Sequence, residues 1–172
     1  EWGSGANGKT VTNDAIAMLL GDYAVRTPTE TLLIKRDGGS IPNDVARLKG
    51  ARFVYASEAE QGKRLAESLV KDISGGDKIT ARFLHKEFFE FYPEFKLWLG
   101  TNHKPIIRGT DQAIWDRIRL IPFTVRIPEN ERIPKTKLFE MFQNEIDGIF
   151  LWLVDGCLKW QNEGLNAQEG IT

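Results

Sequence analysis

Eight residues near the start of the chain have the types and the spacing needed to hold a triphosphate. They read Gly3-Ser4-Gly5-Ala6-Asn7-Gly8-Lys9-Thr10 and fit the pattern G-x-x-x-x-G-K-[ST]. Glycines allow the backbone to curl so that several N–H groups face the phosphate oxygens. The Lys9 ammonium reaches the β- and γ-phosphates, and the Thr10 hydroxyl is placed to bind Mg²⁺. The sequence therefore predicts that all eight residues bind nucleotide.

Polar side chains that could act on this nucleotide follow two apolar stretches further along the chain. Glu58 and Glu60 come after the run 52–56, where a carboxylate would help to hold Mg²⁺ or polarise the attacking water. Glu58 is the stronger candidate because it stands closer to the run, and which of the two activates water stays open. Asn102 follows the run 95–99, where its side chain would touch the γ-phosphate or the water. An asparagine at such a place can also simply close a turn.

These groups need a scaffold that brings the ends of several strands together. Helices are predicted at 11–20, 42–48, 61–73 and 111–116, strands at 31–34, 52–56, 95–99 and 119–125, and a β-hairpin at 79–84 and 88–91. Strands that alternate with helices indicate an α/β domain with a central, largely parallel sheet flanked by helices.

The last part of the chain changes character. Residues 135–160 have helical spacing, which Gly148 or Gly156 would divide into two helices, and the charged segment 128–134 contains two prolines and is typical of a linker. The predicted domains are a nucleotide-binding core at 1–127 and a linker with a C-terminal helical segment at 128–172. Only two residues precede the loop, so we expect this core to lack its first strand and the chain to be a fragment of a longer protein.

Composition excludes several classes of protein. The 172 residues are 41% hydrophobic and 27% charged, which is ordinary for a globular protein, and no apolar run is long enough to cross a membrane. The single cysteine, Cys157, excludes an internal disulfide and is predicted to be a buried or half-buried packing residue. The net charge of −1 means that any nucleic-acid contact must come from a local basic patch, for which 78–108 is the best candidate.

With these elements in order, the sequence resembles superfamily 3 helicases, above all the helicase part of phage, plasmid and poxvirus primase-helicases. The resemblance covers 2–125. It is carried by the loop at 3–10, Ala-Ser-Glu at 56–58, Ser-Gly-Gly-Asp at 74–77, Thr-Ala-Arg-Phe-Leu at 80–84, Phe-Lys-Leu-Trp-Leu-Gly-Thr-Asn-His-Lys-Pro at 95–105 and Ile-Trp-Asp-Arg-Ile-Arg-Leu-Ile-Pro-Phe at 114–123.

The resemblance implies an AAA+-like P-loop NTPase that assembles into a ring, usually a hexamer, around DNA. ATP with Mg²⁺ would be hydrolysed between subunits during DNA replication, in the cytoplasm of a bacterial host or of a virus-infected cell, with a primase domain possible upstream. Thr10 and Glu58 would hold the metal, Glu58 and Glu60 would form the acidic pair, and Asn102 would be the polar sensor. Arg117 would reach a neighbouring subunit's nucleotide, with Arg119 as the fallback.

The same resemblance assigns the contact with DNA to the hairpin between 78 and 91. The cationic candidates there are Lys78, Arg82, His85 and Lys86, the last two near the tip. The aromatic residues Phe83, Phe88 and Phe89 are predicted to pack in the core rather than to stack on bases.

Two other functions fit the residues. The chain could be a P-loop ATPase that loads or positions a replication partner without unwinding DNA. It could also be a small-molecule kinase, which would need an acceptor pocket and an arginine-rich lid.

Overall fold

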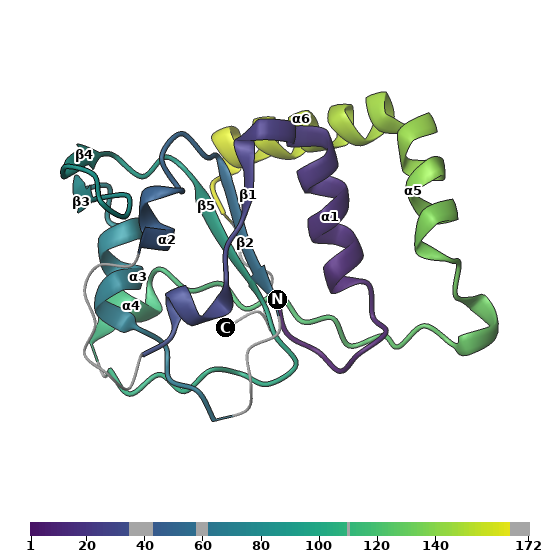
Figure 1. Cartoon of the computed structure of the whole chain (residues 1–172). Helices are drawn as coiled ribbons and strands as arrows, with labels where there is room; N and C mark the ends of the chain where they lie inside the picture. The colour runs from purple at the N-terminus through teal and green to yellow at the C-terminus, as the bar shows by residue number, and fades with distance from the viewer. Residues whose placement is uncertain (35–42, 58–61, 110, 166–172) are drawn as a thin grey trace.

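A computed structural model describes residues 1–34, 43–57, 62–109 and 111–165, and these have a mixed α/β architecture (Figure 1). The central sheet contains β1 (Ala24–Arg26), β2 (Phe53–Ser57) and β5 (Lys96–Gly100), all parallel and in the order β1-β2-β5. The register pairs Ser57 with Gly100, so β2 and β5 end side by side. The predicted α/β class, its parallel sheet and the strands at 52–56 and 95–99 are confirmed.

Residues 1–3 extend this sheet beyond β5. The Trp2 amide donates to Ile121 O at 2.9 Å, the Phe123 amide donates to Trp2 O at 2.7 Å, and the Thr101 amide donates to Glu1 O at 3.1 Å. The segment in front of the loop is therefore hydrogen-bonded on both sides, through isolated bridges at Trp2 rather than as a full strand. The predicted strand at 119–125 is reduced to a bridge at Pro122, which has no N–H to donate to a ladder.

Helices cover both faces of the sheet. α1 (Lys9–Leu20) packs on one face, with α5 (Lys135–Asn144) beside it and α6 (Ile146–Glu163) across one end (Figure 1). α2 (Asn43–Ala46), α3 (Glu67–Ser74) and α4 (Gln112–Trp115) lie on the other side. Among the described residues, none of these helices combines the length and the apolar character needed to cross a bilayer.

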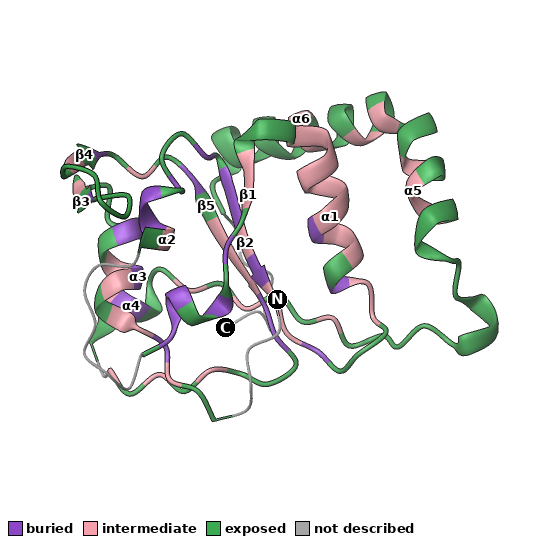
Figure 2. Ribbon diagram, viewed as in Figure 1, coloured by how far each residue is buried: buried purple, intermediate pink, exposed green. Residues whose placement is uncertain are grey.

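The core is centred on β2, where Phe53, Val54 and Ala56 are buried and Tyr55 and Ser57 are half-buried. Val54 and Ala56 are fully buried there, and they join a cluster that includes Leu32, Ile73 and Phe91 (Figure 2). A smaller cluster around Ile114 joins α3 to α4. A strand with little of either face in solvent is expected to be largely apolar, and β2 is apolar up to Ser57.

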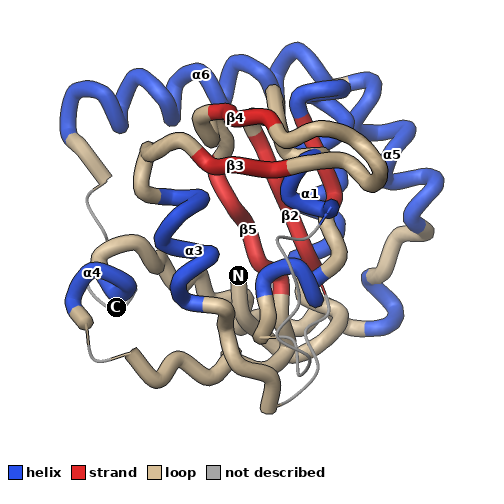
Figure 3. Tube along the Cα trace, turned by 60° about the vertical axis from the view of Figure 1, so that its left-hand side comes forward, coloured by secondary structure: helices blue, strands red, loops and turns tan. Residues whose placement is uncertain are grey.

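The β3–β4 ribbon stands apart from the central sheet. β3 (Ile79–Ala81) and β4 (Phe89–Phe91) pair antiparallel, which confirms the predicted hairpin with shorter strands (Figure 3). The ribbon lies toward the end of the sheet opposite the phosphate loop (Figure 1).

Other local predictions were wrong. The segment predicted as a strand at 31–34 forms a 3-10 helix, Thr29–Leu32, after Pro28, and β1 was not predicted at all. The helix predicted at 61–73 begins only at Glu67, and Gln61 lies outside the described residues. Two further 3-10 turns are Gly21–Tyr23 and Glu129–Glu131.

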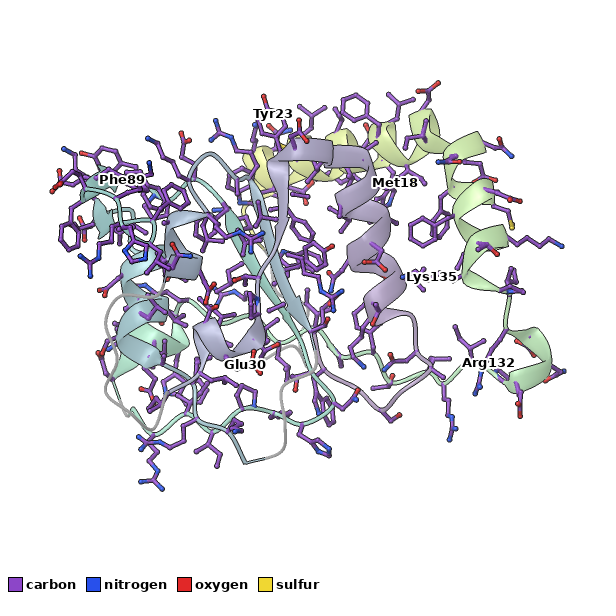
Figure 4. All side chains as sticks on the ribbon, viewed as in Figure 1. Met18, Tyr23, Glu30, Phe89, Arg132 and Lys135 are labelled. Atoms are coloured by element: carbon purple, nitrogen blue, oxygen red, sulfur yellow. The ribbon has the colours of Figure 1, made fainter. Side chains whose placement is uncertain are left out.

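α5 and α6 depart most from the sequence pattern. The break between them falls at Glu145, and both Gly148 and Gly156 lie inside α6. Neither helix contains a buried residue, and Cys157 is exposed, contrary to the prediction. Lys135 ties α5 to α1 through an ion pair with Asp14 at 2.6 Å (Figure 4).

Candidate nucleotide-binding site

The glycine-rich loop turns sharply between the Trp2 segment and α1. Ala6 and Gly8 adopt positive φ angles of 60° and 90°. A side chain at Gly3 is impossible, because its Cβ would lie 2.1 Å from Phe123 O. The loop is fixed on its other side by the Ile127 amide, which donates to Ala6 O at 2.8 Å. Glycine is thus required at Gly3 for close approach and favoured at Gly8 for its backbone angle.

Lys9 is the centre of the site. Its side chain is buried with the residue only 7% exposed, and its ammonium donates to Gly3 O at 2.6 Å. It also donates to Asn7 Oδ1 at 3.0 Å and to Asn102 Oδ1 at 3.2 Å. Burial lowers the pKa of Lys9 from its ordinary value, while the nearby Glu1 carboxylate acts in the opposite direction. The structure therefore brings Lys9 and Asn102 together, although 93 residues separate them.

The backbone amides of residues 4–11 carry the loop's capacity for an anion. Within the described part of the chain, none of them donates a hydrogen bond, and the first α1 amide that does is Thr12, to Gly8 O at 2.9 Å. The Thr10 side chain is exposed beside them. Free amides at a helix N-terminus, next to a buried ammonium, form a ready site for an anion.

A second polar layer lies beneath the loop and was missed from the sequence. Asn13 is 1% exposed and donates from Nδ2 to Glu1 Oε2 at 2.7 Å. Burial raises the pKa of the Glu1 carboxyl. The available signal was the spacing, since Asn13 lies four residues after Lys9 and therefore on the same face of α1.

The acidic candidates Glu58 and Glu60 lie outside the described residues. The residue before them is held firmly: Thr29 Oγ1 donates to Ser57 O at 2.8 Å, and Arg26 Nη2 donates to Ser57 Oγ at 3.3 Å. Ser57 also pairs with Gly100 at the end of β5. The strand that leads into Glu58 thus ends beside the strand that leads into Asn102.

Arg117 and Arg119 do not join this group. Arg117 donates to Ala113 O at 2.6 Å, and Arg119 donates to Asp116 O at 3.1 Å and to Ile118 O at 3.0 Å. Both residues are exposed around the end of α4. Both side chains are therefore accessible to a partner molecule. They are not part of the Lys9 cluster, which consists of Lys9, Gly3, Asn7 and Asn102.

The four cationic candidates of the hairpin are exposed: Lys78, Arg82, His85 and Lys86. The prediction that its aromatic residues pack holds for Phe89, which is half-buried against the core (labelled in Figure 4). Phe83 is 43% exposed and stacks on Phe89 at 5.6 Å. The prediction was wrong for Phe88, which is 58% exposed.

Comparison with known proteins finds relatives in several viruses. "Putative helicase 022R" of Frog virus 3 is 37% identical over 126 residues, which cover 70% of this chain and 13% of the viral protein. "Putative helicase L207/L206" of Acanthamoeba polyphaga mimivirus is 30% identical and covers 99% of this chain. "Putative primase C962R" of African swine fever virus is 33% identical over 119 residues. This chain is homologous to viral proteins named as helicases and primases.

The homology concerns a small part of each relative. The chain spans 13%, 19% and 12% of those three proteins. No family model matches the chain. A solved structure, the apo C-terminal region of NrS-1, aligns with 61% of this chain at 14% identity and a TM-score of 0.41, a likeness too weak to bear on function.

Proposed function

We propose that this chain is the ATPase motor of a superfamily 3 DNA helicase that acts in viral replication. The observation that carries the proposal is the Lys9 cluster, in which one buried ammonium meets Asn7 of the loop and Asn102 of the β5 end. The viral relatives supply the link to helicases. In this proposal the fold is an AAA+-like P-loop core.

The residues present suit ATP with Mg²⁺. The amides without partners at 4–11 would receive phosphate oxygens, and Lys9 would exchange its present acceptors for the outer phosphates. The exposed Thr10 hydroxyl and the Glu58 carboxylate would hold Mg²⁺, which supplies charge neutralisation to the transferring phosphoryl group. Asn102 would orient the attacking water, and Glu58 or Glu60 would polarise it.

Arg117 would complete the site of a neighbouring subunit in a ring. It is exposed, and the one hydrogen bond that its guanidinium makes to the described residues is to Ala113 O, so it can be redirected toward a partner. A trans-acting arginine of this kind is worth about 10³–10⁵ in rate. The ribbon would face DNA with its cations, and a primase activity would reside elsewhere in the same polypeptide.

The test begins with ATP hydrolysis in the presence and absence of single-stranded DNA. Stimulation by DNA is expected of the motor and of a partner-loading ATPase, and it is not expected of a small-molecule kinase. Strand displacement on a forked substrate then separates the motor from the loading ATPase. Hydrolysis that DNA leaves unchanged would overturn the helicase proposal.

The trans arginine has its own test. Arg117→Ala should lower turnover by about 10³ or more while ATP affinity is retained. Arg119→Ala tests the fallback: a loss of turnover in this variant and not in Arg117→Ala would assign the trans role to Arg119. When Arg117→Ala is mixed with a Lys9 variant, interfaces that combine an intact loop with an intact arginine should restore part of the activity. Absence of any recovery at every mixing ratio would count against a shared site.

A further inference from the structure

We propose that the outer face of the β3–β4 ribbon binds the bases of single-stranded nucleic acid, with Phe88 and Tyr92 as stacking surfaces. The inference rests on the proposed function and deepens it, because it adds base contacts to the phosphate contacts expected of the lysines and arginines.

The two faces of the ribbon differ sharply. The register pairs Ile79 with Phe91 and Ala81 with Phe89, and these four side chains belong to the core cluster or pack against it. The alternate residues face outward. They are Lys78, Thr80, Arg82, Phe88, Glu90 and Tyr92, and all six are exposed.

Two aromatic rings on a solvated face have no explanation in packing. Phe88 and Tyr92 are each 58% exposed, whereas Phe89 and Phe91 between them belong to the core cluster or pack against it. An extended chain rises about 3.3 Å per residue, so the backbones of Phe88 and Tyr92 are separated by about 13 Å and their rings would contact different bases. Exposed aromatic platforms are the usual means of holding single strands without reading sequence.

A cation accompanies each ring. The Arg82 guanidinium lies 4.8 Å from the centre of the Phe88 ring, and the Lys78 ammonium lies 5.6 Å from the centre of the Tyr92 ring. The same pair of residues can therefore stack on a base and neutralise the phosphate attached to it. This alternation of ring and charge favours a polyanion with planar bases over an apolar protein segment.

Glu90 sits between the two rings and limits this surface. Its carboxylate lies 3.4 Å from Lys78 Nζ and is opposite Thr80 in the ladder. This carboxylate repels phosphate, and its ion pair with Lys78 competes with phosphate for the ammonium group. Glu90→Gln should therefore raise affinity for single strands severalfold. Unchanged affinity would remove this face from the contact.

The decisive experiment separates bases from phosphates. Binding of the protein is measured with a fluorescent oligothymidylate and with an abasic strand of the same length. Phe88→Leu and Tyr92→Leu should each weaken binding to oligothymidylate by about tenfold and leave the abasic strand unaffected. Phe88→Tyr, which keeps a ring, should bind like the wild type.

Other results overturn the inference. Equal losses on both strands would mean that the rings only support the ribbon, and no loss on either would exclude them from the contact. A change in oligomeric mass with unaltered DNA binding would make this face a protein interface. ATP turnover without DNA should stay at the wild-type level in these variants. A wild-type protein without ATPase activity would instead refute the proposed function, while the comparison of the two strands would still report on stacking.

Discussion

The phosphate loop and the β3–β4 ribbon both present cations, and they do so in opposite ways. Lys9 is 7% exposed and donates to three oxygens from two separate segments. Lys86 at the ribbon tip is exposed, and among the described residues its hydrogen bond is that of its backbone amide to Phe83 O at 3.0 Å. In the proposed motor, each meets phosphate: one meets the nucleotide and the other meets DNA.

The contrast shows how the burial of a lysine determines what its charge contributes. A buried, oriented ammonium acts at short range in a medium that screens it little, so its loss should remove chemistry and depend weakly on salt. A solvated lysine acts together with others and releases counterions, so its loss should be modest and depend strongly on salt. The predictions below test this division, from the largest effect to the smallest.

Lys9→Met should reduce ATP hydrolysis to background, because it removes the ammonium and keeps an apolar side chain of similar length. The melting temperature should stay near that of the wild type, since burial already disfavours the charged form. Steady-state hydrolysis and thermal unfolding are measured on the same samples. Full turnover in this variant would exclude Lys9 and the phosphate loop from ATP hydrolysis. The comparison between the loop and the ribbon would then no longer hold.

Much of this arrangement could be predicted from residue types. The loop, the strands at β2 and β5, and their order along the chain sufficed to predict that Asn102 would lie near the phosphates, and the structure brings it to Lys9. Whether it acts there stays a prediction. The strand β2 could be predicted because a strand that is largely covered on both faces has consecutive apolar residues, as at 53–56.

The rest depended on tertiary contacts that a local pattern does not contain. β1 has three residues, too few for a period, and it exists because it pairs with β2. Pro122 has the apolar neighbours of a strand and lacks the donor for a full ladder. The helical spacing at 135–160 predicted helices correctly but not their exposure, because spacing alone does not say whether another surface covers the apolar face.

Asn102→Ala should lower turnover by about 10², the typical cost of losing one oriented polar group in a site of this kind, with a smaller effect on ATP affinity. It also removes one of the three acceptors of Lys9. His103→Ala is the matched control, because His103 is the exposed neighbour whose described hydrogen bonds involve only its backbone. Equal losses in both variants would indicate a loop effect rather than a contact with Lys9.

The lowered pKa of Lys9 predicts a pH effect that the ribbon should not share. ATP affinity should fall as pH rises through this lowered pKa, at a pH below the 10.5 of an ordinary lysine, because the neutral amine does not attract phosphate. Between the folded and the unfolded pKa, the unfolded chain binds more protons, so this group makes stability rise with pH. Titration of nucleotide binding and of unfolding against Lys9→Met isolates both trends. An ATP affinity that stays constant up to pH 10.5 would contradict the lowered pKa that burial gives to Lys9.

Lys86→Ala should have the smallest effect, a severalfold loss of affinity for single-stranded DNA with unchanged ATP turnover in the absence of DNA. Because Lys86 is solvated, the loss should shrink as salt is added, and the slope of log affinity against log salt should become shallower by about 1. Glu87→Ala beside it is the matched control and should act in the opposite direction. If Lys86→Ala left the slope unchanged, the ribbon tip would not neutralise phosphate. The proposed difference between Lys9, a buried cation that acts in catalysis, and Lys86, a solvated cation that binds DNA, would then be wrong for Lys86.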